Sequence, residues 1–261
     1  ALYSAADLLS GVKRIAESDP SEDVRRVAVL YFASFASDDK IQFLLGVLEN
    51  DKQSAPKVLA AALLANNAIE GQTDAIVAAL RKTAATKDAY LMRACGKALA
   101  ELGYAEGIDL LIDSMEFPSI DAFFNYNYNI PNFLAAYTGT DFSEGNTGER
   151  YNPENWRKWM AANRDKLDLK ANIAAHRDFA KLPASISTDA DLDAYELFLK
   201  QYPNHTRARK ALAGYLNSTA WNLVTAQRDT PAFAAQKGLR YRIACSGLDE
   251  DANSLDTWAG G

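Results

Sequence analysis

The residues of this chain that could carry out chemistry are few and far apart. Its 261 residues include two histidines, His176 and His205, and two cysteines, Cys95 and Cys245. His176 stands two residues before Asp178, a pair that could supply a general base but is more typical of a solvated helix face. The sequence contains no zinc-site spacing, no phosphate-binding glycine loop and no serine nucleophile elbow. We therefore expect no enzyme activity, no catalytic residue, no metal site and no cofactor.

An aromatic and asparagine-rich segment is the most unusual stretch of the chain. Residues 123–133 read Phe-Phe-Asn-Tyr-Asn-Tyr-Asn-Ile-Pro-Asn-Phe. On a helix, Phe124 and Tyr128 lie one turn apart on the same face, with Asn127 nearby. Aromatic and arginine side chains are frequent anchors of protein interfaces. Two interpretations stay open: this face binds a partner, or Phe124 and Tyr128 pack beneath the loop and helix that follow.

Composition and charge exclude several classes of protein. The chain carries 28 Lys and Arg against 34 Asp and Glu, for a net charge of −6, without a run of five or six like charges. This acidic balance disfavours a nucleic-acid binder, because phosphate contacts need clustered basic residues. No apolar run approaches the roughly 18–20 residues that cross a bilayer. The chain begins with Ala1; if this is a processed N-terminus, an extracytoplasmic location follows, and otherwise the compartment is unknown.

A repeat of 33 to 35 residues organises the first half of the chain. Residues spaced i, i+3, i+4, i+7 and i+11, which share one face of a helix, recur four times. The four sets are Val24, Val27, Ala28, Tyr31 and Phe35; Val58, Ala61, Ala62, Ala65 and Ile69; Leu91, Ala94, Cys95, Ala98 and Leu102; and Tyr126, Asn129, Ile130, Phe133 and Tyr137. All but Asn129 are apolar or aromatic, whereas chance would give about ten of the twenty. We predict that each set is the buried face of a helix.

A second amphipathic helix precedes each of these faces. The predicted preceding helices cover residues 5–16, 40–48, 74–84 and 106–115. A two-helix unit of this length cannot bury its apolar face alone, so successive units stack. We therefore expect four stacked helix–turn–helix units over residues 1–139. Cys95 falls in the column of Ala28 and Ala62, which predicts a small buried side chain and not a reactive thiol.

Part of this region resembles a known family. Asp-Val-Arg-Arg-Val-Ala at 23–28 and Tyr-Leu-Met-Arg-Ala-Cys-Gly-Lys-Ala-Leu-Ala-Glu-Leu-Gly at 90–103 resemble the second helices of HEAT repeats. The stretch at 137–142, followed by Asn-Pro-Glu-Asn-Trp-Arg-Lys-Trp at 152–159, is similar to the ending of many bacterial HEAT-repeat proteins. The resemblance spans about residues 1–167. It implies an α-solenoid that acts as a protein-binding scaffold.

The remaining sequence predicts a cap and a second helical region. Residues 140–180 read as a loop and a capping helix that contains Trp156 and Trp159, which we expect to close one end of the solenoid. A linker follows near Pro183. Residues 190–261 contain a helix–proline–helix pattern, and a Trp-containing segment recurs 37 residues later. These features are similar to tetratricopeptide repeats, and the last unit reads as truncated.

These features together predict an all-α protein that binds a protein or peptide, as a non-catalytic scaffold or as a subunit of a larger complex. The repeat register aligns Tyr128 with arginines of two earlier units. The expected contact residues are Arg26, Arg93, Phe124, Asn127 and Tyr128. The alternative is a small-molecule lyase or chaperone with a pocket near residues 123–133.

Overall fold

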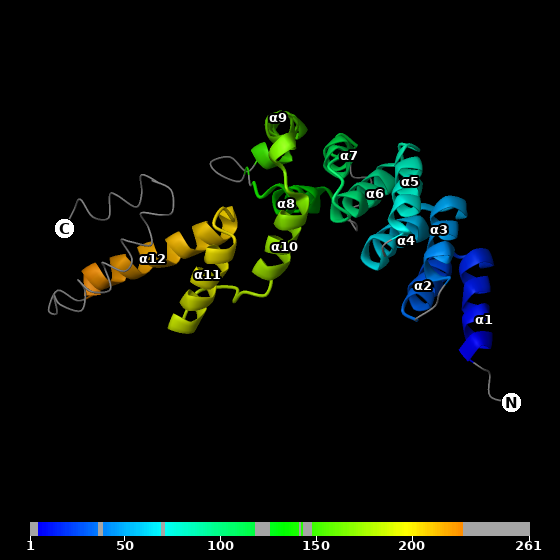
Figure 1. Ribbon diagram of the computed structural model, residues 1–261, viewed down its shortest axis with the longest axis horizontal. Coiled ribbons are helices and arrows are strands. Elements are labelled where there is room, and N and C mark those ends of the chain that lie inside the picture. The colour runs from blue at the N-terminus through cyan, green and yellow to red at the C-terminus, as the bar shows by residue number, and fades with distance from the viewer. Residues whose placement is uncertain are drawn as a thin grey trace. The chain divides into compact units, whose positions relative to one another are not determined.

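The fold is all-α in the part of the chain that the computed structural model describes. The described residues are 5–35, 39–68, 71–117, 126–140, 142 and 148–226. They form twelve α-helices and two short 3-10 helices, without a β-strand (Figure 1). The all-α prediction is confirmed. Among these helices, none is both long and apolar enough to cross a membrane.

The chain divides into two compact units, Ala1–Ile173 and Ala174–Gly261, and the division falls inside one helix. The helices of the first unit are α1 (Ala5–Ser18), α2 (Glu22–Ala33), α3 (Lys40–Asn50), α4 (Ser54–Asn67), α5 (Thr73–Ala84), α6 (Ala89–Glu101), α7 (Glu106–Ser114), α8 (Tyr126–Thr138), η1 (Glu149–Tyr151), α9 (Pro153–Asn163), η2 (Arg164–Lys166) and the start of α10 (Leu169–Phe179). The second unit holds the end of α10 with α11 (Asp189–Gln201) and α12 (Thr206–Ala226).

Helical hairpins packed in succession build the first unit. The pairs α1–α2, α3–α4 and α5–α6 pack within themselves, and the second helices pack in series, α2 on α4 and α4 on α6 (Figure 1). Side chains at the turns start several of these helices. Ser21 accepts a hydrogen bond from the amide of Val24 at the start of α2, and Asp88 accepts two at the start of α6. This packing agrees with the predicted stacking of hairpins.

The repeat register differs from the predicted one in α4. The matching buried positions are Ala28, Val29 and Phe32 in α2; Ala60, Ala61 and Leu64 in α4; and Cys95, Gly96 and Leu99 in α6. The step is therefore 32 residues from α2 to α4 and 35 from α4 to α6, because the two connections differ in length. The observed steps of 32 and 35 residues have the same sum as the predicted steps of 34 and 33. The predicted register therefore holds between α2 and α6 and is wrong only for α4.

The predicted buried face of α2 is wrong. Val24, Val27, Tyr31 and Phe35 are 44, 61, 52 and 37% exposed, and of that set only Ala28 is buried. The reason is their position in the array. The residues at the same place in α6 face the preceding α4, whereas among the described residues no helix stands in the corresponding place before α2.

Two apolar cores lie within the first unit. The first runs from Ala16 to Leu99 and the second from Ala100 to Ile173. Trp156 of α9 is fully buried in the second core, with its indole NH donating to the carbonyl of Arg150 at 2.8 Å. Trp159 is only partly buried at the edge of the same core. Both tryptophans thus pack against apolar residues at this end of the unit.

The α6–α7 crossing depends on glycine. A Cβ atom built on Gly107 would come within 3.0 Å of the backbone of Gly96 and Ala100. The two helices approach so closely that their backbones are in contact, which only glycine permits. This crossing joins the first core to the second.

The second unit contains a compact hairpin of α11 and α12. Leu192 contacts Leu212 and Leu216, while Tyr195 and Phe198 pack on Ala208. Thr188 and Asp191 form a capping box at the start of α11. The predicted tetratricopeptide-like continuation over residues 227–261 lies outside the described residues.

Candidate partner-binding groove

A wide hollow of the first unit lies between the second helices of three hairpins. Its volume is about 630 Å³. Helix α2 contributes Glu22, Asp23 and Arg26 to its rim, while α6 and the turn before it contribute Asp88 and Tyr90. Side chains of α4 form the floor, namely Ala55, Val58, Leu59 and Ala62. The hollow thus has an apolar floor and a charged rim.

A smaller hollow of about 180 Å³ continues this surface toward α8. It shares Val58 and Ala62 with the wider one, and Ala94 and Ala98 of α6 line it further along. Phe133 of α8 lies at its far end. We call the two hollows together the second-helix groove. The small alanine side chains create the groove, because they leave space between helices that larger residues would fill.

The rim of the wider hollow is acidic. Three carboxylates, of Glu22, Asp23 and Asp88, stand against the single guanidinium of Arg26. Asp23 pairs with Arg26 at 3.2 Å, and Asp88 accepts a hydrogen bond from the hydroxyl of Ser54 at 2.8 Å. The rim therefore favours a ligand with a positive charge beside an apolar group.

Polar contacts in the smaller hollow join its helices. Lys97 pairs with Glu101 at 2.7 Å, and its ammonium lies 5.3 Å from the ring centre of Phe133. The Tyr137 hydroxyl donates to Glu101 at 3.2 Å. These contacts fix the far end of the groove between α6 and α8.

The predicted contact residues occupy different places. Arg26 is exposed on the rim of the wider hollow, as a contact residue needs. Arg93 borders the smaller hollow but is only 4% exposed, and its guanidinium donates to the carbonyls of Ser114 and Phe117 at 3.0 and 3.3 Å. Arg93 therefore ties α6 to the end of α7 and offers little surface to a partner. Burial also lowers its pKa.

The aromatic part of the predicted site is not placed. Phe124 lies outside the described residues, and the side chains of Asn127 and Tyr128 in α8 do as well. The sequence analysis placed Val58 in a predicted buried face and did not single out Leu59, because both read as apolar core positions of a helix. The small side chain of Ala62 could have indicated the groove, because an alanine at this position leaves space beside α4.

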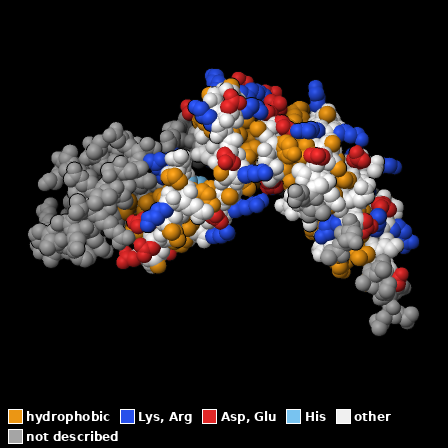
Figure 2. Space-filling model, in the orientation of Figure 1, with side chains coloured by type: hydrophobic (Ala, Val, Ile, Leu, Met, Phe, Trp, Pro, Cys, Tyr) orange, Lys and Arg blue, Asp and Glu red, His pale blue; other side chains and the backbone are white. Residues whose placement is uncertain are grey.

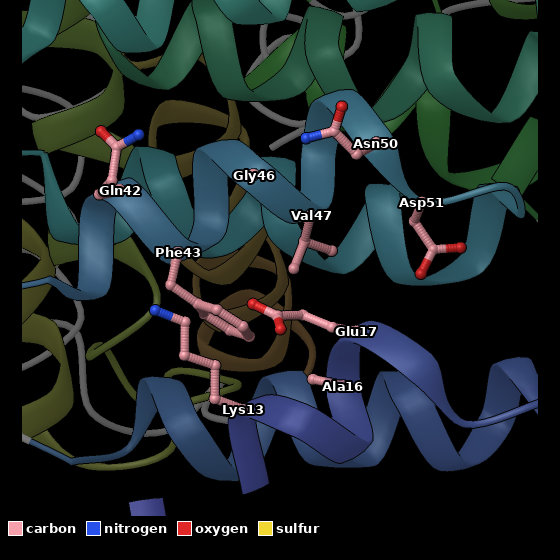
Figure 3. A pocket seen from close by; sticks show the side chains of 9 residues that line it. All are labelled: Lys13, Ala16, Glu17, Gln42, Phe43, Gly46, Val47, Asn50 and Asp51. Atoms are coloured by element: carbon pink, nitrogen blue, oxygen red, sulfur yellow. The ribbon is translucent and has the colours of Figure 1, made fainter. Parts of the chain in front are cut away.

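A separate hollow of about 340 Å³ lies between α1 and α3. In Figure 3 the side chains of Lys13 and Glu17 reach from α1 toward Phe43, whereas Gln42 and Asn50 point away from α1. The Lys13 ammonium lies 5.9 Å from the ring centre of Phe43. The lining contains no histidine, cysteine, serine or threonine. This hollow can hold a polar group by charge, but it lacks the usual pairing of nucleophile and base.

The two histidines lie in the second unit, and His205 serves its packing. His205 stacks on Phe179 at 4.8 Å between ring centres, and its Nδ1 accepts a hydrogen bond from the amide of Ala208 at 3.2 Å. Burial lowers its pKa to about 4. His176 also has a lowered pKa, by burial and then by the charge of Arg207. Neutral His205 therefore acts as a cap for the start of α12.

Cys95 is fully buried, and burial raises the pKa of its thiol to about 12. This confirms the prediction of a buried cysteine. In the part of the chain that is described, no cluster of His, Cys, Asp and Glu could hold a metal ion.

The first unit is thus a series of helical hairpins with a groove along its second helices. No family model, no curated protein and no solved structure matches this chain.

Proposed function

We propose that the chain is a non-catalytic helical-repeat scaffold that binds a protein segment in the second-helix groove. The observation that carries this proposal is the groove itself, which crosses α2, α4 and α6 and continues to α8. Extended surfaces that cross successive repeats are how helical-repeat proteins bind their partners. The same groove would serve a subunit of a larger complex, in which the bound segment belongs to another subunit.

The shape and charge of the groove indicate the kind of segment that it takes. The apolar floor of Val58, Leu59 and Ala62 accepts an apolar side chain of the partner. The acidic rim near Glu22 favours a lysine or arginine next to that side chain. We therefore expect a peptide with an apolar anchor flanked by basic residues.

The alternative of a lyase or chaperone has weaker support. Two described residues of the 123–133 segment, Ile130 and Phe133, border the smaller hollow, of about 180 Å³. Sites for drug-sized molecules usually measure about 300–1,000 Å³. A protein segment also fits the open course of the groove better than an enclosed small molecule does.

A peptide-display selection against the whole chain tests the proposal. Selected peptides should share an apolar–basic pattern and should lose at least tenfold in affinity for Ala62→Arg, which fills the groove floor. Ala78→Arg is the matched control, because Ala78 is an exposed alanine of α5 outside the groove. Equal binding to Ala62→Arg and Ala78→Arg would contradict the proposal.

Charge variants test the rim. Arg26→Glu makes the rim more acidic and should strengthen binding of the basic peptides, while Arg14→Glu changes an exposed arginine of α1 outside the groove and should not. A second variant, Phe124→Ala with Tyr128→Ala, tests the predicted aromatic contacts. Unchanged peptide affinity in this variant would show that Phe124 and Tyr128 do not contact the peptide.

A further inference from the structure

Arg93 of α6 is a buried cation that has no ion-paired carboxylate among the described residues. It is only 4% exposed, and both of its hydrogen bonds run from Nη2 to main-chain carbonyls at the end of α7. Arg25 of α2, which is buried to a similar extent, pairs with Asp51 instead. In Figure 2, many Lys and Arg side chains of the first unit lie at the surface beside acidic ones. The positive charge of Arg93 thus lacks a counter-charge in the described chain, which is costly inside a protein.

This cation borders the smaller hollow of the second-helix groove. Most of the lining is apolar and comes from α4, α6, α7 and α8, including Ala62 and Ala98. The two other charged residues of the lining, Lys97 and Glu101, pair with each other at 2.7 Å. Nε of Arg93 is fully enclosed, whereas Nη1 is not, and neither atom donates to a described residue. Nη1 is therefore the atom that a group in the hollow can contact.

The size and lining of the hollow indicate which group it takes. Its volume is about 180 Å³, and an apolar cavity of about 150 Å³ holds one benzene molecule, so there is room for a single side chain. An aspartate or glutamate of the partner would bring a carboxylate without an apolar group. The last residue of a chain can bring both, an apolar side chain and a carboxylate on the same α-carbon. The hollow therefore suits an apolar C-terminal residue.

We propose that the smaller hollow binds the C-terminal residue of the partner segment, with its carboxylate on Nη1 of Arg93 and its side chain beside Ala62 and Ala98. The proposal rests on the proposed function and adds the direction in which the segment lies. A hydrogen bond between a guanidinium and a carboxylate is about twice as strong as a neutral one. The bound carboxylate also supplies the counter-charge that Arg93 lacks.

The acidic rim of the wider hollow sets the position of the basic residues in such a segment. Asp88 precedes Arg93 by five residues, about 8 Å along a helix. Glu22 and Asp23 belong to α2, which lies two helix spacings from α6, about 16–20 Å. An extended chain covers about 3.3 Å per residue. We therefore expect a lysine or arginine about two to six positions before the C-terminus.

Two libraries of random peptides, one displayed with free C-termini and one fused to the carrier through its C-termini, test the proposal on the whole chain. The free library should yield sequences that end in an apolar residue. A selected peptide with a free C-terminal acid should bind about tenfold more tightly than the same peptide as a C-terminal amide. This comparison uses the wild-type chain, so it does not depend on the folding of a variant.

Equal affinity of the acid and amide forms overturns the proposal. It would leave Arg93 to a carboxylate of this chain, such as Asp121, which lies outside the described residues. If the fused library alone gives peptides that depend on Ala62, the C-terminal contact is wrong while the proposed function stands. If neither library gives a binder, both are wrong.

Arg93 variants locate the effect. Arg93→Met keeps an unbranched side chain without the charge, so acid and amide peptides should bind equally. Arg93→Lys keeps a cation without the planar fork and should reduce the acid preference about threefold, which also serves if Arg93→Met does not fold. Arg14→Met, at an exposed position of α1 outside both hollows, is the control and should keep the full preference. Circular dichroism checks folding, and an undiminished acid preference in the folded Arg93 variants overturns the proposal.

Discussion

A bidentate salt bridge joins Arg25 of α2 to Asp51, the residue that follows α3. It links the first hairpin to the second. Nε and Nη2 of Arg25 each donate to one carboxylate oxygen of Asp51 at 2.9 Å. Nη1 donates to the carbonyl of Asp19 at 2.8 Å, so the same guanidinium also holds the turn of its own hairpin. Burial by itself raises the pKa of Asp51, but the hydrogen bonds from Arg25 and from the Gln53 amide outweigh it, and the pKa is lowered.

Removing Arg25 should strongly destabilise the first unit. Arg25→Met leaves the Asp51 carboxylate buried without its partner, which costs about 3–5 kcal/mol of unfolding free energy. Arg25→Met with Asp51→Asn should recover at least half of the loss, because asparagine carries no charge and still accepts the Gln53 amide. Urea unfolding followed by circular dichroism measures both. Arg26→Met, at an exposed position, is the control and should change stability by less than about 0.5 kcal/mol.

Acid should weaken the second unit through His205. Its pKa is about 4 in the folded chain and about 6.5 when unfolded, so the unfolded chain binds the proton first. Stability should therefore fall as pH drops from about 6.5 to about 4, by about 1–2 kcal/mol after allowance for partial exposure. Thermal unfolding at pH 7 and pH 4.5 measures the change.

His205→Asn provides the comparison for this pH effect. Asparagine also caps helix starts but does not titrate, so at pH 7 the variant should keep the cap and lose only the stability that the ring contact with Phe179 contributes. The fall between pH 7 and pH 4.5 should shrink to the part contributed by His176. An unchanged fall in His205→Asn would show that His205 is not its source.

A methyl group at Gly107 should disrupt the α6–α7 crossing. Gly107→Ala places a Cβ atom against the backbone of Gly96 and Ala100 and should cost about 1–3 kcal/mol. Gly46→Ala, in the interior of α3, meets nothing within 4 Å and should be neutral or slightly stabilising. Urea unfolding midpoints of the two variants measure this difference in stability. Equal midpoints would contradict the predicted cost of a Cβ atom at Gly107.

The thiol of Cys95 should be inert in the folded chain. Its burial and its pKa of about 12 leave almost no thiolate at pH 8. In a Cys245→Ser background, reaction with an aromatic disulfide reagent should be at least 100-fold slower without urea than in unfolding urea. Rapid labelling of the native chain would show that this part of the core opens readily.

Helical periodicity was enough to predict the hairpins, but not their register. The apolar spacing of Val24, Val27 and Tyr31 is correct for a helix face, and the equivalent face of α6 is indeed directed at its neighbour. Burial, however, depends on whether a neighbour exists, which spacing on one helix does not report. The unequal steps of 32 and 35 residues could not be predicted from the sequence either. Their sum equals that of two nearly equal steps, so the average period is the same.

The candidate groove was harder to predict than the fold. Arg26 is exposed on the groove rim, and its role as a partner contact stays a prediction. Arg93 occupies the corresponding row but turns inward to the carbonyls of Ser114 and Phe117. The close approach at Gly107 was missed for a similar reason. Each depends on backbone atoms of another helix, and these have no signature in the sequence around the residue itself.

The α6 helix has a role that neither core shows alone. Leu99 belongs to the first core, and the next residue, Ala100, belongs to the second. Residues of one helical turn share backbone hydrogen bonds, so loss of the turn that holds Leu99 also loosens Ala100. Melting that reaches this turn of α6 from one core therefore weakens the other core as well.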